Sequence, residues 1–139
     1  MTYDPNNIFA KILRGEAPSF KVYEDDMTYA FMDVMPQAEG HTLVIPKFPA
    51  ADIFDLHPDY QAAVALTTQK LAPAVKRAFK APGIMIVQLN GAESGQTVFH
   101  LHNHIIPRFS GLELKFHARN LADFGLLKQH AEWIKAEIR

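Results

Sequence analysis

The fold of this chain is decided by the stretch Gly95-Gln96-Thr97-Val98-Phe99-His100-Leu101-His102-Asn103-His104-Ile105-Ile106-Pro107-Arg108. Three histidines occupy alternate positions in it. Alternate side chains of a β-strand point to the same face, so a strand would place the three imidazoles in one row, about 6.5–7 Å apart along the backbone. A strand is favoured over a helix because aromatic and β-branched residues are common here, a glycine precedes the stretch and a proline ends it.

This row of histidines predicts a functional site. Neutral imidazole is a nucleophile, a proton donor or acceptor, and a metal ligand, and it titrates near neutral pH. A lone histidine is most often a satisfied core or surface residue. Three of them on one strand face are hard to explain by packing, because polar rings bury little apolar area. Nucleophilic or acid–base catalysis and metal binding are therefore the chemistries to test.

Composition narrows the class of protein. The chain has 139 residues, of which 48% are hydrophobic and 21% charged, and we expect one soluble domain spanning 1–139. The net charge is −1 with no basic run, so no nucleic-acid or membrane partner is expected. There are no cysteines, which excludes disulfides and thiolate metal sites. Without a signal-like N-terminus or a bilayer-spanning apolar run, we expect a cytoplasmic protein.

The remaining pattern predicts an α+β domain. We expect a short helix over 8–13 capped by Asn6 or Asn7, a helix from about 57 to 80 that Pro73 kinks or splits, and a C-terminal helix over 121–138. Strands are expected at 21–25, 28–34, 41–46, 84–90 and in the histidine stretch. Because the strands cluster as hairpins, the sheet should be antiparallel, with about five strands and the helices on one side.

The stretch from His100 to Ile106 resembles the signature of the histidine-triad (HIT) family, in which three histidines alternate with apolar residues. Two residues depart from the family pattern. The position of Asn103 is usually apolar, and the position of Thr97, just before the signature, is usually serine. Further segments look like the Hint-type branch of the family, in the family's order over about the first 108 residues: Ile8-Phe9, Val22-Tyr23-Glu24-Asp25, Ala30-Phe31-Met32-Asp33, Pro36-Gln37-Ala38, His41 with Leu43-Val44-Ile45-Pro46-Lys47, and Asn90 through Arg108.

The resemblance implies an enzyme that binds purine nucleotides. Members of this branch cleave at the α-phosphorus, often a phosphoramidate bond, through a nucleotidyl-histidine intermediate and without a metal cofactor. It implies His102 as the nucleophile, His100 and His104 beside it, and His41 as a fourth histidine of the group. It also implies a homodimer.

The resemblance assigns the remaining site residues as well. Asp33 matches the acid that holds the ribose hydroxyls. The apolar slot for the base matches Ile8, Phe9, Ile12, Phe31 and Leu43, and the polar residues beside the phosphate and leaving group match Asn90, Gln96 and Thr97. From the residues alone, Asp33 could merely end a strand, the apolar residues could be core, and Asn90-Gly91 could be a plain turn. His57, His117 and His130 are interpreted as a capping residue and solvated surface groups.

Two alternatives stay open. One is a zinc enzyme whose metal is held by His41, His100 and His102. The other is a nucleotide-binding regulatory protein with incidental hydrolysis. A separate structural zinc, which many relatives hold near the N-terminus through a Cys-x-x-Cys pair, should be absent. The matching positions carry Asn7, Ala10 and Pro49.

Overall fold

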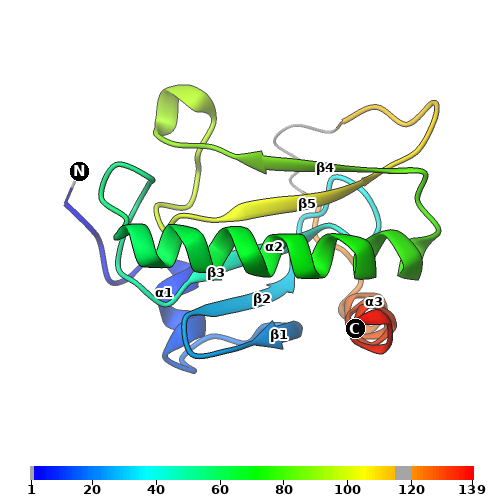
Figure 1. Cartoon of the computed structure of the whole chain (residues 1–139), viewed down its shortest axis with the longest axis horizontal. Helices are drawn as coiled ribbons and strands as arrows, with labels where there is room; N and C mark the ends of the chain where they lie inside the picture. The colour runs from blue at the N-terminus through cyan, green and yellow to red at the C-terminus, as the bar shows by residue number, and fades with distance from the viewer. Residues whose placement is uncertain (1, 115–119) are drawn as a thin grey trace.

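The computed structural model describes residues 2–114 and 120–139 (Figure 1). The strands are β1 (Lys21–Glu24), β2 (Thr28–Met32), β3 (Thr42–Pro46), β4 (Gly83–Gln88) and β5 (Asn103–Arg108). They form a five-stranded sheet in the order β1-β2-β3-β5-β4, and every neighbouring pair is antiparallel. The helices are α1 (Ile8–Leu13), α2 (Pro58–Phe79) and α3 (Phe124–Glu137), with a 3₁₀ turn η1 at Ala92–Ser94. The predicted α+β fold is confirmed.

The two faces of the sheet carry separate apolar clusters. Met32 and Val44 point to one face and pack in the main core with residues of α2 and α3. Figure 1 shows α2 lying across this face. Phe31, the neighbour of Met32 on β2, points the other way and packs against Phe9 of α1. The expectation of helices on one side is therefore wrong for α1, because the outward-facing apolar residues of β2 and β3 need their own cover.

This second face is the one that carries the site. His104 of β5 pairs with Leu43 of β3, and directly opposed residues of an antiparallel pair point to the same side. Leu43 packs in the cluster that includes Phe9, so His104 lies on the α1 face. The next residue, Ile105, is fully buried in the main core on the α2 face. The site is thus located on the α1 side of the sheet.

Helix α2 is one unbroken helix of 22 residues. His57 caps it by accepting a hydrogen bond from the Asp59 amide, which confirms the capping role, and Lys80 ends it in the left-handed region at φ 51°. Pro73 was predicted to kink or split this helix, and the split is wrong, because the helix continues past Pro73, which is exposed. In the described part of the chain, no helix combines the length and apolarity needed to cross a membrane.

Helix α3 begins at Phe124, three residues after the expected start, because Asp123 accepts hydrogen bonds from the first-turn amides. His130, expected on the surface, is buried with its ring edge-on to Phe79 at 4.9 Å between centroids. That prediction is wrong, because α3 turns this residue against α2 rather than toward solvent. His117 lies outside the described residues.

The histidine stretch enters the sheet later than predicted. β5 begins at Asn103, and His100 and His102 precede its first ladder pair. In this part the amide of Leu101 donates to the carbonyl of Ala50 at 2.9 Å, so a loop takes the place of a neighbouring strand. The strand interpretation is therefore confirmed for His104 and wrong for His100 and His102.

Candidate active site

Four histidines that are distant in sequence come together on the α1 face. We call His41, His100, His102 and His104 the histidine cluster. The ring of His41, just before β3, lies 5.1 Å from that of His104 between centroids, and the rings of His102 and His104 are 4.8 Å apart. Of the three alternating histidines only His104 belongs to a strand, and the ring of His102, just before β5, still packs beside it.

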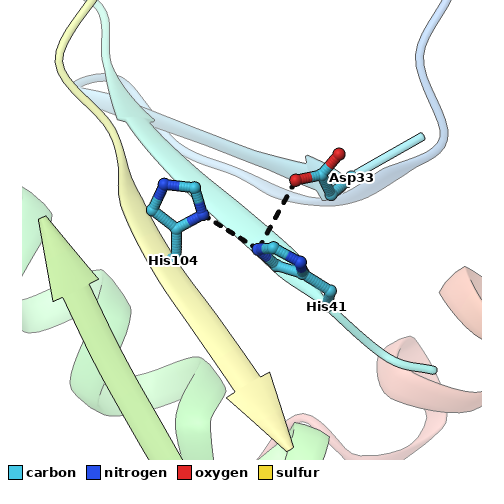
Figure 2. Close-up of side chains that lie close together, drawn as sticks. All are labelled: Asp33, His41 and His104. Atoms are coloured by element: carbon cyan, nitrogen blue, oxygen red, sulfur yellow. Dashed lines mark hydrogen bonds and ion pairs between the residues drawn. The ribbon is translucent and has the colours of Figure 1, made fainter. Parts of the chain in front are cut away.

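The protons on His41 and His104 follow from their partners. The Gln37 amide donates to His41 Nδ1 at 3.0 Å, and a backbone amide can only donate, so this nitrogen is bare. Burial lowers the pKa of His41 and of His104 to about 3, so both rings are neutral at pH 7. His41 therefore carries its proton on Nε2, which donates to His104 Nδ1 at 2.9 Å (Figure 2). The proton of His104 must then sit on Nε2.

This Nε2–H of His104 is a buried donor without a partner among the described residues. Buried donors of this kind are rare and costly, and they mark places where a ligand completes the hydrogen bonding. Because the donor is held by the His41–His104 bond, it needs no reorganisation to meet an anionic oxygen.

His102 has the opposite arrangement. Its Nδ1–H donates to the carbonyl oxygen of His100 at 2.7 Å, which can only accept. Burial lowers the pKa of His102, so the ring is neutral and Nε2 carries a free electron pair. Phe9 packs against this ring at right angles, 5.0 Å away between centroids. His102 thus offers a nucleophilic nitrogen beside the donor of His104.

Asp33 follows β2 and lies at the edge of the cluster. One carboxylate oxygen accepts from the Met35 amide at 2.9 Å, and the other is 3.4 Å from His41 Nε2 (Figure 2). Burial raises the pKa of Asp33 to about 6. Since its side chain keeps 20% of its exposure, the carboxylate can still accept hydrogen bonds from a ligand.

The residues predicted for the base slot fall into two groups. Phe9, Phe31 and Leu43 are buried together in one apolar cluster, and Phe9 packs against His102. Ile12 is half-buried beside them, and Ile8 is 47% exposed. Only Ile8 and Ile12 therefore offer much free apolar surface to a ligand.

Gln96 holds the loop between β4 and β5. Its side-chain oxygen accepts from the Gly91 amide at 2.7 Å, and its NH₂ group donates to the carbonyls of Ala51 and Val98 at 2.6 and 3.0 Å. With both ends of the amide engaged, Gln96 shapes the loop rather than presenting a free donor.

Asn90 plays a similar part at the end of β4. Its oxygen accepts from the Ile53 amide at 2.8 Å, and its NH₂ group donates to Gln88 at 2.9 Å, which leaves one N–H for a ligand. Thr97, in contrast, is exposed on the loop. Of the three polar residues predicted beside the phosphate, Thr97 is thus the most accessible.

A metal fits the histidine cluster poorly. Asp33, His41 and His104 each offer one atom, all within 4.8 Å of one another. However, the Gln37 amide keeps the proton of His41 on Nε2, the atom that would have to ligate. A metal would need an imidazolate there and would break the His41–His104 bond. The alternative set of His41, His100 and His102 also fits a metal poorly, because both ring nitrogens of His100 are bonded, Nε2 to the Pro46 carbonyl at 2.9 Å and Nδ1 to the Tyr3 hydroxyl at 2.6 Å.

The N-terminal positions that match a structural zinc site do not fit a metal either. Ala10 and Pro49 have no ligand atoms, and the side-chain oxygen of Asn7 caps α1 by accepting from the Ala10 amide at 2.9 Å. Near these positions, Nδ1 of His100 is bonded to the Tyr3 hydroxyl at 2.6 Å. Sequence reasoning missed Tyr3, since nothing in the local pattern connects it with a histidine 97 positions away.

Comparisons with known proteins identify the family of this chain. The profile of the HIT domain family matches residues 14–111. The crystal structure of a Hit-like protein involved in cell-cycle regulation from Bartonella henselae has a TM-score of 0.92 and 50% identity, covering 99% of this chain and 100% of that one. A Zn-bound histidine triad family protein from Mycobacterium smegmatis has a TM-score of 0.84 and 34% identity, covering 95% and 92%. Adenosine 5'-monophosphoramidase HNT1 of Candida albicans is 36% identical over 94% of this chain and 90% of its own length. The chain therefore belongs to the HIT family.

Proposed function

We propose that this protein is a purine nucleotide-binding hydrolase or transferase that cleaves at the α-phosphorus of a nucleoside phosphoramidate or a related nucleotidyl substrate. The reaction runs through a covalent nucleotidyl-histidine on His102 and uses no metal. The observation that carries the proposal is the bare Nε2 of His102 beside the unpaired Nε2–H of His104. The activity named for the C. albicans relative supports it.

In the first step, the electron pair on His102 Nε2 forms a bond to the α-phosphorus while the bond to the leaving nitrogen breaks, and that nitrogen takes a proton from solvent water. His104 donates its Nε2–H to a phosphoryl oxygen, where negative charge builds up. None of the cluster histidines is an imidazolium at pH 7, because burial lowers the pKa of His41 and His104 to about 3 and that of His100 to about 4. They therefore hydrogen-bond in the neutral form.

In the second step, water attacks the same phosphorus and releases a proton to solvent, the bond to His102 breaks and the nucleoside monophosphate leaves. Covalent catalysis of this kind divides one difficult displacement into two easier ones. Asp33 accepts hydrogen bonds from the ribose hydroxyls, and Ile8 and Ile12 contact the base.

Rapid mixing with adenosine 5'-phosphoramidate, followed by a quench in alkaline denaturant and peptide mass spectrometry, tests this mechanism. A nucleoside monophosphate adduct is expected on His102. The control His57→Asn preserves a helix cap and should leave the adduct unchanged. Stereochemistry gives a second measurement, because two displacements retain the configuration at phosphorus. Inversion at phosphorus, or an adduct on another residue, would contradict the mechanism.

Acid should weaken substrate binding before it slows chemistry. Burial raises the pKa of Asp33 to about 6, so the carboxylate becomes neutral as the pH falls through that value and accepts hydrogen bonds less well. Burial lowers the pKa of His102, which favours the unprotonated form of the nucleophile. We expect KM to rise several-fold from pH 7 to pH 5 while kcat changes little.

The matched variant for this measurement is Asp33→Asn. It should have a raised KM at every pH and a flatter dependence of KM on pH than the parent. Comparison of the two proteins removes any contribution from titration of the substrate. A parent KM that follows the same curve as that of Asp33→Asn would exclude Asp33 as the titrating group.

The homodimer and the cytoplasmic location stay predictions. Self-association is supported by the position of β4 at an edge of the sheet, where Ile86 is exposed. A role limited to nucleotide-dependent regulation also stays open, since the same pocket and histidines would serve it.

A further inference from the structure

His100 connects three separate segments of the chain. Its Nε2 contacts the carbonyl oxygen of Pro46 at 2.9 Å, its Nδ1 contacts the Tyr3 hydroxyl at 2.6 Å, and its own carbonyl accepts from His102 Nδ1 at 2.7 Å. The Pro46 carbonyl can only accept, so Nε2 carries the proton. Because the ring is neutral, Nδ1 is bare and the tyrosine must be the donor.

Tyr3 belongs to a segment that is itself held in place. The carbonyl of Asp4 accepts from the amide of Asn7 at 3.3 Å and from its side chain at 2.8 Å. Arg14, at the other end of α1, donates to the carbonyl of Pro5 at 2.7 Å. Burial raises the pKa of Tyr3, so its hydroxyl stays protonated at neutral pH. The donor is therefore presented by an anchored segment rather than a loose tail.

The same segment also contacts the nucleophile. Phe9 of α1 packs at right angles on the His102 ring, while Tyr3 bonds to the ring of His100. Residues 3–14 thus touch both histidines that precede β5, where no strand pairing holds the chain. Tyr3 and His100 line a cavity of about 370 Å³ together with Ala10 and Pro49.

We propose that Tyr3 is a positioning residue for His100. Its hydroxyl donates to Nδ1 of His100, the ring nitrogen that the Pro46 carbonyl leaves free. With both ring nitrogens bonded, His100 keeps its carbonyl aimed at His102 Nδ1. That carbonyl keeps Nε2 of His102 bare for attack, so this inference rests on the proposed function.

The test is the variant Tyr3→Phe, which removes only the hydroxyl. Without this hydroxyl, Nδ1 of His100 becomes a buried acceptor lacking a partner. That loss favours rotation of the ring or a change of tautomer. We expect kcat for adenosine 5'-phosphoramidate to fall about three- to tenfold, the effect of losing one such hydrogen bond. KM and the Kd for adenosine monophosphate should stay within about twofold, because Tyr3 contacts no part of the substrate.

A spectroscopic measurement separates positioning from general destabilisation. Long-range ¹⁵N–¹H correlation spectra report which nitrogen of each histidine is protonated. The parent should show His100 protonated on Nε2 and His102 on Nδ1, and Tyr3→Phe should lose the single form of His100. The matched control is Tyr23→Phe, which removes a hydroxyl bonded to Asp25 at 3.1 Å in the β1–β2 hairpin. It should change neither spectrum nor kcat.

The outcomes are distinct. Unchanged His100 signals in Tyr3→Phe, or a kcat no lower than that of Tyr23→Phe, would overturn the positioning role. A fall in kcat caused only by a loss of folded protein would appear in the unfolding curve of the variant and would also count against it. If the parent did not cleave the phosphoramidate at all, the proposed function would fail, whereas the spectra would still show whether Tyr3 sets the tautomer of His100.

Discussion

Replacing His102 by glycine should lower kcat for nucleoside phosphoramidate hydrolysis by about 10⁴-fold or more, because loss of a nucleophile removes the covalent route altogether. Binding of adenosine monophosphate should persist within a few-fold, since the ribose and base contacts are assigned to Asp33, Ile8 and Ile12. Steady-state kinetics and equilibrium titration of the same preparations measure the two effects. Full activity in the variant would contradict nucleophilic catalysis by this residue.

Chemical rescue makes the test more specific. The glycine variant leaves a space the size of the imidazole ring against Phe9, so added free imidazole should restore part of the activity. The control is His57→Asn, which changes a histidine at the start of α2 and should keep normal kcat and no response to imidazole. Rescue of the His102 variant by any amine of similar basicity, regardless of shape, would indicate a proton-transfer role instead of attack at phosphorus.

Replacing Gly40 by alanine should lower the free energy of unfolding by about 2–5 kcal/mol, the sum of a left-handed backbone cost and a steric overlap. Gly40 has φ +89°, and a Cβ there would lie 2.6 Å from the ring of Phe79. The ring cannot retreat easily, because it packs against His130 and Trp133. Urea denaturation followed by circular dichroism measures the change.

Gly15→Ala is the matched control. Gly15 also has a positive φ, +75°, but a Cβ there meets nothing within 4 Å. Gly15→Ala should therefore lower the free energy of unfolding by the backbone cost alone, about 1–2 kcal/mol. Equal losses in the two variants would show that the Phe79 ring gives way. Because Gly40 immediately precedes His41, we also expect the folded fraction of Gly40→Ala to have reduced kcat.

Much of the fold and the identity of the site could be predicted from local patterns. The alternation of His100, His102 and His104, with glycine before and proline after, indicated an extended segment, and the short apolar runs separated by turns indicated an antiparallel sheet. Asn7 was one of two candidates for the cap of the first helix, and it is the one that caps α1. The spacing of apolar and polar residues along the chain indicates which side chains share a face. Strands, helices and caps can therefore be predicted from a few neighbouring residues.

Features that depend on packing between elements could not be predicted in this way. Amphipathic spacing shows that a helix has an apolar side, but not which face of the sheet it covers, so α1 was placed on the wrong side. His130 looks like any surface histidine until α3 is turned against Phe79. Gln96 was predicted to contact the phosphate, but its NH₂ group already donates to the carbonyls of Val98 nearby and of Ala51, 45 positions away.

By itself the sequence determined which side chains are present, their alternation near β5 and hence the family. Only the tertiary structure decided where the protons sit. The amide of Gln37, the carbonyl of Pro46 and the carbonyl of His100 each meet one imidazole nitrogen and assign it as acceptor or donor. The chemistry of a histidine depends on which nitrogen carries the proton. Here backbone amides and carbonyls make that choice, and they are the same groups in every sequence. Only folding brings them next to the imidazole rings.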